Sequence, residues 1–95
     1  YPQETENVLT LHPKVYDVAV IGIPHEEYGE EVKAVVQLTE SAEADADTEQ
    51  ELIDFCLENL SKFKCPRSVD FVDDMPRLPT GKLLKRTIRD RYWPS

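Results

Sequence analysis

Cysteine is scarce in this sequence, which has only Cys56 and Cys65, nine positions apart. Two cysteines cannot supply the disulfide framework on which many small secreted domains depend. They form no C-x-x-C pair and have no histidine nearby at zinc-ligand spacing, which disfavours a zinc site or a redox centre. A single disulfide between them stays open, but the pattern favours reduced thiols in a cytoplasmic protein.

Long hydrophobic runs are also missing. No apolar stretch approaches the roughly 18 residues that a membrane-spanning helix needs, so we expect no transmembrane segment. The opening residues YPQETENV lack the basic region and apolar stretch of a secretory signal. With 95 residues, 40% of them hydrophobic, the chain suits one small globular domain over residues 1–95. Because the sequence does not begin with methionine, we expect it to be part of a longer chain.

Positive charge is scarce in most of the chain and concentrated in its last third. The net charge is −8, and residues 1–61 carry 15 acidic side chains against two lysines, Lys14 and Lys33. Residues 62–95 instead carry nine basic side chains against four acidic ones, a local balance of +5. A contiguous cationic segment implies an anionic partner: a nucleic acid, a lipid, an acidic protein surface or a nucleotide phosphate.

The first half of the chain predicts a helix followed by two strands. Pro2 suits a first helical turn, and Pro13 ends the helix. Residues 15–24 are largely apolar, which predicts a strand covered on both faces and central in its sheet. Residues 31–38 alternate between apolar and polar, which predicts a second strand, antiparallel to the first and joined to it by a polar turn around Gly29.

The second half predicts a helix, a short strand and a terminal helix. Thr48 and Glu51 match a capping box that would open the first of these helices. Residues 69–73 read as a third strand and residues 83–93 as an amphipathic helix. The elements together predict an α+β fold, a small mixed or antiparallel three-stranded sheet with flanking helices. The helix opened by the capping box has apolar residues at helical spacing, which form its predicted inner face: Leu52, Ile53, Cys56, Leu57 and Leu60.

Gly81 and Lys82 invite comparison with a phosphate-binding P-loop. That motif needs a glycine five positions before Gly81 and a serine or threonine after the lysine. Pro76 and Leu83 occupy these positions, which excludes a P-loop. The sequence therefore predicts a lysine presented by a loop, where Gly81 can adopt backbone angles that a side chain would forbid. The ammonium group of such a lysine can reach an anion as a compact point charge.

The sequence gives little support for a metal site, for nucleophilic catalysis or for nucleic-acid binding. The segment HEEYGEE, residues 25–31, offers a histidine and four carboxylates, but it lacks H-E-x-x-H spacing, so we expect an exposed turn and no metal site. The serines, cysteines and two histidines provide no arrangement of nucleophile, base and orienting group. Basic residues within 85–91 suit nucleic acid, but the acidic remainder and the absence of a known motif disfavour it.

Several segments, in order, resemble the carboxy-terminal domain of the adenylate-forming superfamily. They are YPQETENVL, VAVIGIPHEEYGEEVKAVVQL, LSKFKCPRSVDFVDDMPRLPTGKLLKR and IRDRYW. This superfamily includes acyl-CoA synthetases, firefly luciferase and the adenylation domains of nonribosomal peptide synthetases. The resemblance is strongest to medium- or long-chain fatty acyl-CoA and aryl-CoA ligases. It implies a mobile lid domain whose large amino-terminal domain and hinge are absent from this sequence.

The resemblance also implies an activity. The intact chain would be an ATP-dependent acid-thiol ligase. It would convert a carboxylic acid, expected to be a fatty acid, to acyl-AMP and transfer the acyl group to CoA. The implied cofactors are ATP, CoA and Mg²⁺, bound mainly by the missing large domain, so the fragment alone is not expected to be active. Lys82 closes the family motif P-x-x-x-x-G-K and would be the catalytic residue of adenylation, contacting the substrate carboxylate and the α-phosphate of ATP.

In the superfamily the small domain then rotates and brings another face to the site for thioester formation. The resemblance places Gly81, beside the lysine, among the cofactor-binding residues. It also implies CoA contacts from Tyr28 and Gly29 in the turn and from Phe63 and Lys64 in the FKCP loop. Two positions depart from the family pattern. Cys65 replaces a residue that is often basic, and Thr5 replaces an isoleucine, which we expect to weaken a core contact.

Two alternatives to a CoA ligase stay open. One is an adenylation enzyme that delivers its acyl group to a carrier protein, and the other is a non-catalytic interaction module that reuses the fold. The implied partners are the large amino-terminal domain of the same chain and the substrates ATP, CoA and a carboxylic acid, with no nucleic acid. The identity of the acid is not encoded here, because its pocket lies in the other domain.

Overall fold

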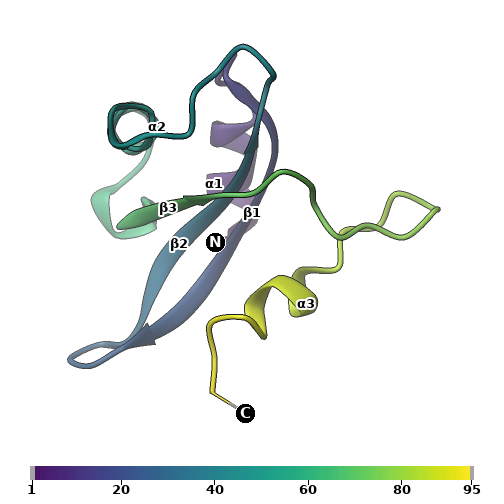
Figure 1. The fold of residues 1–95 in the computed structure, drawn as a ribbon. Coiled ribbons are helices and arrows are strands. Elements are labelled where there is room, and N and C mark those ends of the chain that lie inside the picture. Colours follow the sequence, from purple (N-terminus) through teal and green to yellow (C-terminus); the bar gives the residue numbers. More distant parts are fainter. Residues whose placement is uncertain (1, 95) are drawn as a thin grey trace.

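The computed structural model describes residues 2–94 and confirms the predicted α+β fold (Figure 1). Among these residues, no helix has the length and apolar character needed to cross a bilayer. The order of elements also agrees with the prediction, apart from one added 3₁₀ helix, η1. The elements are α1 (Pro2–Leu9), β1 (Val15–His25), β2 (Gly29–Leu38), α2 (Ala46–Asn59), η1 (Lys62–Lys64), β3 (Ser68–Phe71) and α3 (Lys85–Arg89).

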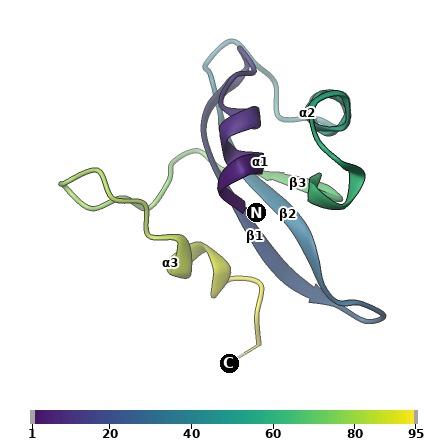
Figure 2. The same cartoon turned by 180° about the vertical axis from the view of Figure 1, so that it is seen from behind.

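The three strands form one mixed sheet in the order β1-β2-β3. β1 and β2 are antiparallel, with Val20 opposite Ala34, whereas β2 and β3 are parallel, with Ala34 opposite Val69. The prediction that β1 is central is therefore wrong, because β1 is an edge strand and β2 is central. β1 is apolar on both faces because α1 and α2 cover one face of the sheet and α3 covers the other (Figures 1 and 2).

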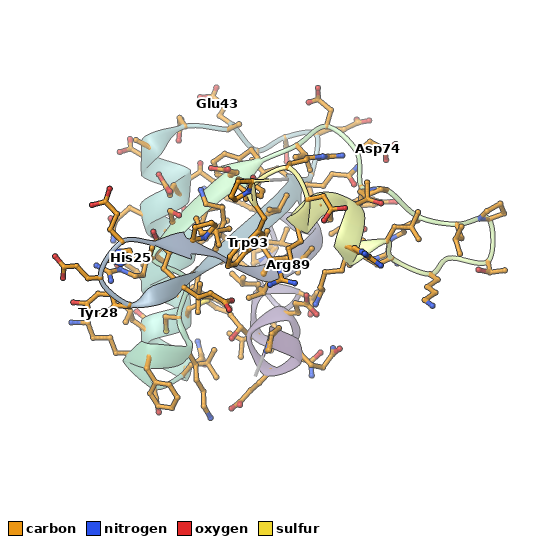
Figure 3. The ribbon with its side chains drawn as sticks, turned by 90° about the horizontal axis from the view of Figure 1, so that it is seen from below. His25, Tyr28, Glu43, Asp74, Arg89 and Trp93 are labelled. Atoms are coloured by element: carbon orange, nitrogen blue, oxygen red, sulfur yellow. The ribbon has the colours of Figure 1, made fainter. Side chains whose placement is uncertain are left out.

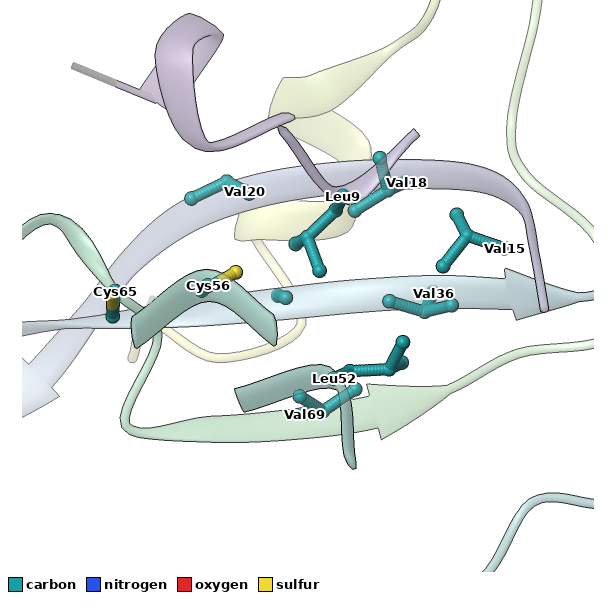
Figure 4. Packing of buried hydrophobic residues seen from close by; sticks show 10 residues of the cluster. Leu9, Val15, Val18, Val20, Val36, Leu52, Cys56, Cys65 and Val69 are labelled. Atoms are coloured by element: carbon teal, nitrogen blue, oxygen red, sulfur yellow. The ribbon is translucent and has the colours of Figure 1, made fainter. Parts of the chain in front are cut away.

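The hydrophobic core consists of two clusters, one on each side of the sheet. The cluster under α1 and α2 contains Leu9, Val18, Val20, Val36 and Leu52, among others (Figure 4). The cluster under α3 consists of buried Ala19, Ile21, Val35, Met75 and Ile88. Successive residues of β1 enter opposite clusters because side chains alternate across a strand.

Side chains from distant parts of the sequence cover the open edge of β1. A Glu6 carboxylate oxygen on α1 accepts a hydrogen bond of 2.7 Å from the backbone N–H of Val20, and the same oxygen pairs with the ammonium of Lys85. The indole N–H of Trp93 donates to the carbonyl of Gly22 over 2.8 Å. These bonds satisfy edge groups that would otherwise be open to another strand, and they hold the carboxy-terminal segment against the sheet.

The N-cap of helix α2 lies three residues before Thr48, the predicted start of the capping box, so that prediction is wrong. Asp45 is the N-cap, and its side chain accepts a 2.8 Å hydrogen bond from the backbone N–H of Thr48. Glu51 instead pairs with Lys14 at 2.7 Å and with His12 at 3.0 Å. Leu57, predicted to face the core, is 45% exposed, whereas Leu52 is fully buried.

The boundaries of β3 and α3 also differ from those predicted. β3 covers residues 68–71 instead of 69–73, and α3 has only five residues, well short of residues 83–93. α3 begins late because Leu83 and Leu84 pair with the segment before them.

Thr5 is buried, with 1% of its surface exposed, and its hydroxyl donates a 2.8 Å hydrogen bond to the carbonyl of Lys64. The polar replacement for isoleucine therefore ties α1 to the loop after α2 and leaves no unsatisfied hydroxyl in the core.

The sheet is joined to the carboxy-terminal segment through the carboxylate of Asp70. One of its oxygens accepts a hydrogen bond of 2.5 Å from the hydroxyl of Tyr92, and the other accepts a hydrogen bond of 2.9 Å from the ammonium of Lys33. Burial, and then the hydrogen bond to Asp70, raise the pKa of Tyr92 to about 12 from its ordinary 10.0. The folded protein thus favours the neutral phenol.

Replacing Tyr92 with phenylalanine is expected to lower the free energy of unfolding by about 1 kcal/mol at neutral pH, the net value of a typical hydrogen bond. Because folding raises the pKa of Tyr92, this contribution is complete below pH 10 and is lost as the pH rises through 12. Denaturant unfolding of wild type and variant at pH 7, 10 and 11.5 checks this. A difference that grows between pH 10 and 11.5 would contradict it.

Candidate functional site

Lys82 lies in a short hairpin formed by residues 76–84. Two backbone hydrogen bonds join its arms: the N–H of Leu78 donates to the carbonyl of Lys82 over 2.9 Å, and the N–H of Leu84 donates to the carbonyl of Pro76 over 2.8 Å. Between them, Arg77 faces Leu83 in an antiparallel bridge. The tip closes through a 2.8 Å hydrogen bond from the N–H of Gly81 to the carbonyl of Leu78. The sequence predicted a loop here, and the paired arms of the hairpin are an addition from the structure.

The residues of the tip suit this hairpin. A three-residue hairpin loop combines a turn with a following residue of positive φ, and here the loop is residues 79–81. Pro79 sets the φ angle needed early in the turn, and Gly81 has φ of 93°, a conformation that other residues rarely adopt. The motif P-T-G-K therefore places Lys82 directly after the tip, at the start of the returning arm.

The hairpin presents Lys82 to solvent. Its side chain is exposed and makes no hydrogen bond or ion pair with any residue in 2–94. The tip of the hairpin lies away from the sheet and from α3 in both views of the ribbon (Figures 1 and 2). A cation presented in this way is available to an anion on another domain.

A second candidate site is a groove of about 740 Å³ between the β1–β2 turn and the loop that follows α2. Its most exposed apolar residues are Tyr28 and Phe63, with 67% and 69% of their surface exposed to solvent. These two aromatics are far apart in sequence, and the fold brings them to one surface, as the family resemblance implied. The other lining residues are Glu30, Glu31, Val32, Ile53, Leu57, Lys62, Cys65, Pro66 and Arg67.

The β1–β2 turn holds Tyr28 in place. Gly29 has φ of 79°, which lets the chain reverse directly after Tyr28. The His25 ring stacks on the Tyr28 ring with centroids 4.7 Å apart, and its Nδ1 accepts from the N–H groups of Glu27 and Tyr28 (Figure 3). The guanidinium of Arg67 lies 5.6 Å from the centroid of the Tyr28 ring. The turn therefore presents a Tyr28 ring that has an imidazole stacked on it and a guanidinium over it.

Lys64 lies apart from the lining of the groove. Its ammonium pairs with Glu4 of α1 at 2.9 Å and lies 5.7 Å from the Phe63 ring centroid. The basic residues that do line the groove are Lys62 and Arg67, which the sequence reasoning missed. Their position in the same short loop as Phe63 was the available signal.

Cys65 lines the groove as an almost fully buried thiol, with 5% of its surface exposed. Burial raises the pKa of this thiol above its ordinary value, and the S–H group points to the carbonyl of Ser61 over 3.5 Å. Cys65 and Cys56 are both free. A neutral, buried thiol provides no positive charge at this position.

The hairpin and the groove lie at opposite ends of β1. Arg77 in the hairpin binds Asp17 near the start of the strand, whereas Tyr28 lies just beyond its end at His25. At about 3.4 Å per residue, the eight residue steps from Asp17 to His25 span about 27 Å. Lys82 and the groove therefore lie on different parts of the domain.

The described residues provide no metal site of their own. Across 2–94, no three His, Cys, Asp or Glu side chains gather closely enough to hold a metal ion.

Comparisons with known sequences find similar proteins among ligases. The chain is 42% identical over 93 residues to a fatty acid–[acyl-carrier-protein] ligase, ScoC, of Streptomyces coeruleorubidus, covering 98% of this chain and 17% of the relative. It is 40% identical over 92 residues to the long-chain-fatty-acid–CoA ligase FadD13 of Mycobacterium tuberculosis, covering 97% of this chain and 18% of the relative.

Solved structures show the same relationship. An acyl-CoA synthetase of Brucella canis superimposes with a TM-score of 0.92 and 34% identity, covering 96% of this chain and 17% of that protein. The chain thus spans less than a fifth of the length of these three proteins. Residues 4–82 match the family model described as the AMP-binding enzyme C-terminal domain. The chain belongs to this family of carboxy-terminal domains of AMP-binding enzymes.

Proposed function

We propose that the chain is the carboxy-terminal domain of an ATP-dependent ligase that activates a fatty acid as acyl-AMP and then transfers the acyl group to CoA. Lys82 serves the first reaction and the Tyr28–Phe63 groove serves the second. The observation that carries this proposal is the placement of the Lys82 hairpin and the groove at opposite ends of β1, whose residues from Asp17 to His25 span about 27 Å. Two chemically suited faces at opposite ends of one domain fit two successive reactions at one active site.

In the first reaction the substrate carboxylate attacks the α-phosphorus of ATP, forming acyl-AMP and releasing pyrophosphate. Two anions must approach each other, and negative charge builds on the phosphoryl oxygens in the transition state. The exposed ammonium of Lys82, at the start of the returning hairpin arm, would lie against these oxygens and the carboxylate. It would lower the barrier electrostatically, without accepting or donating a proton.

In the second reaction the CoA thiol attacks the acyl-AMP carbonyl, forming the thioester and releasing AMP. The groove supplies what the nucleotide end of CoA requires. Tyr28 and Phe63 offer flat apolar surfaces for the adenine ring, and Lys62 and Arg67 offer positive charge for phosphates. Gly29 allows the turn that holds Tyr28 at the rim. Lys64, paired with Glu4, would support the loop from behind the groove.

We assign the ATP pocket, the acid pocket and the Mg²⁺ ligands to the large amino-terminal domain. This assignment is supported by the small share of each relative that the chain spans. When bound there, Mg²⁺ would neutralise phosphate charge. We also propose a cytoplasmic location for the intact protein, in keeping with its two free cysteines.

A carrier protein is the second candidate acceptor. It presents a phosphopantetheine thiol, the same nucleophile that CoA carries, and one relative is named a fatty acid–[acyl-carrier-protein] ligase. The groove would then receive a protein surface in place of adenine. The exposed aromatics suit either acceptor, and the two basic residues of the lining, Lys62 and Arg67, are balanced by Glu30 and Glu31, so the charge of the groove does not decide between them.

The intact protein tests this proposal when it is incubated with ATP, Mg²⁺ and a long-chain fatty acid. Pyrophosphate release measures adenylation, and thioester formation is measured separately with CoA and with a phosphopantetheinylated carrier protein. We expect adenylation, followed by rapid transfer to CoA. Adenylation with transfer to the carrier protein alone would replace the proposed acceptor. Absence of adenylation with fatty, aryl and short-chain acids would favour the non-catalytic module.

Replacing Tyr28 with alanine in the intact enzyme is expected to raise the KM for CoA about tenfold, because stacking of a base on an aromatic ring contributes about 1–3 kcal/mol. The rate of adenylate formation should not change. Tyr28→Phe keeps the ring and should keep the wild-type KM. Leu11→Ala is the control, since Leu11 is an apolar residue, 76% exposed, outside the groove. An unchanged KM in Tyr28→Ala would remove Tyr28 from the CoA site.

A further inference from the structure

We propose that Arg77 is the positioning residue for Lys82, because it fixes the hairpin that carries the lysine against the start of β1. Its Nε and Nη2 groups donate to the two carboxylate oxygens of Asp17 over 2.8 and 2.7 Å. Its Nη1 group donates to the carbonyl of Gly81 over 2.5 Å. One side chain thus joins the sheet to the tip of the hairpin. This inference rests on the proposed function of Lys82 and concerns the same reaction.

The bond to Gly81 acts directly on the backbone of Lys82. The carbonyl of Gly81 and the N–H of Lys82 belong to the same planar peptide unit. Holding that carbonyl therefore fixes the plane from which the Lys82 side chain departs. Without Arg77, this peptide keeps no hydrogen bond within residues 2–94, whereas the peptide units on either side of it stay bonded through the N–H of Gly81 and the carbonyl of Lys82.

The anchor on the sheet is itself held in place. Asp17 lies where the register of β1 against β2 shifts, between Val15 and Asp17. Such irregularities redirect side chains from the regular alternation of a strand. The Asp17 side chain is only 17% exposed, and its Oδ1 also accepts a 2.9 Å hydrogen bond from the N–H of Val18. Arg77 therefore binds a carboxylate whose orientation is already set.

The geometry requires arginine. A guanidinium group is planar and can bind both oxygens of a carboxylate with one edge while its remaining nitrogen reaches another acceptor. A lysine provides one ammonium centre and cannot make this set of three bonds. Each of the three nitrogens of Arg77 donates a hydrogen bond within the domain, and we therefore assign Arg77 a role through Lys82 instead of a contact with substrate.

The test uses the intact enzyme and follows the two half-reactions separately in single turnovers. We expect Arg77→Ala to slow acyl-adenylate formation about 10- to 100-fold, the scale expected when a reacting group is displaced by about 1 Å. Thioester formation from supplied acyl-adenylate and CoA should stay at the wild-type rate. Asp17→Asn removes the charge of the anchor at nearly constant side-chain volume, and it should also slow acyl-adenylate formation.

A double variant shows whether Arg77 acts through the lysine. In a Lys82→Ala background, Arg77→Ala should cause no further loss of adenylation, since there is no ammonium left to position. Lys14→Ala is the control, because it removes a comparably short ion pair, 2.7 Å to Glu51, away from the hairpin. That variant should match wild type in both half-reactions.

The outcomes separate this inference from the proposed function. Wild-type adenylation by Arg77→Ala, together with slow adenylation by Lys82→Ala, would overturn the positioning role alone. Equal slowing of both half-reactions by Arg77→Ala, or a full further loss in the double variant, would also overturn it. Wild-type adenylation by Lys82→Ala would overturn the assigned role of Lys82, and this inference with it.

Discussion

Replacing Lys82 with alanine in the intact enzyme is expected to slow acyl-adenylate formation about 10²- to 10³-fold, the usual cost of losing one preorganised group that stabilises developing charge. Thioester formation from supplied acyl-adenylate and CoA should be unchanged, because the groove lies at the other end of β1. Single-turnover measurements of the two half-reactions check this. The selectivity matters more than the size of the loss, because damage to the fold would slow both reactions.

Two further variants test what Lys82 contributes. Arg86 is also exposed and belongs to the same basic segment, so Arg86→Ala should leave both half-reactions unchanged if the position of Lys82, and not local positive charge, is decisive. Lys82→Arg keeps the charge but presents it as a planar group at a different reach, and we expect only partial recovery of adenylation. Adenylation at the wild-type rate in Lys82→Ala would show that this lysine is not part of the reaction.

The order of helices and strands was predictable because apolar periodicity records which faces of each element are buried. Position within the sheet was not, because an apolar strand can be central or can lie at an edge that other segments cover. Pro24 was the unused signal: a proline inside a strand favours an edge, where its missing N–H breaks no ladder bond. The covering bonds from Glu6 to Val20 and from Trp93 to Gly22 join residues far apart in sequence, and no local pattern indicates them.

The start of α2 was misplaced for a local reason. Asp45-x-x-Thr48 and Thr48-x-x-Glu51 overlap, and both resemble caps. Tertiary contacts decide between them: Glu51 is used by Lys14 and His12, and Thr48 is buried. Cap signals alone could not settle the choice.

The residues of the candidate site were predictable only as far as a motif carries them. Pro79, Gly81 and Lys82 specify a turn and its lysine locally, so the position of Lys82 was available from sequence. Arg77 was not singled out, because its role depends on Asp17, 60 positions away. Lys64 and Arg67 are equally basic in the sequence, and only the fold shows that Arg67 lines the groove while Lys64 pairs with Glu4.

Helix α2 joins the core to the groove, since Leu52 and Leu57 face different surroundings. Leu52 is fully buried in the cluster with Leu9, Val36 and Val69 (Figure 4). Leu57 is 45% exposed and lines the groove. The same residue type on the same helix therefore serves stability at one position and a binding surface at the other.

Replacing Leu52 with alanine is expected to lower the free energy of unfolding by about 2–5 kcal/mol, through lost burial and the cavity left behind. A 95-residue domain has a total stability of only about 5–15 kcal/mol, so the change removes a large part of it. Leu57→Ala makes the same chemical change five residues further along α2 and should cost less than about 1 kcal/mol, because its side chain is already half in water. Denaturant unfolding of the three 95-residue chains measures both values. Similar losses at the two positions would mean that α2 packs on the sheet through a different face, and the wall of the groove would have to be assigned anew.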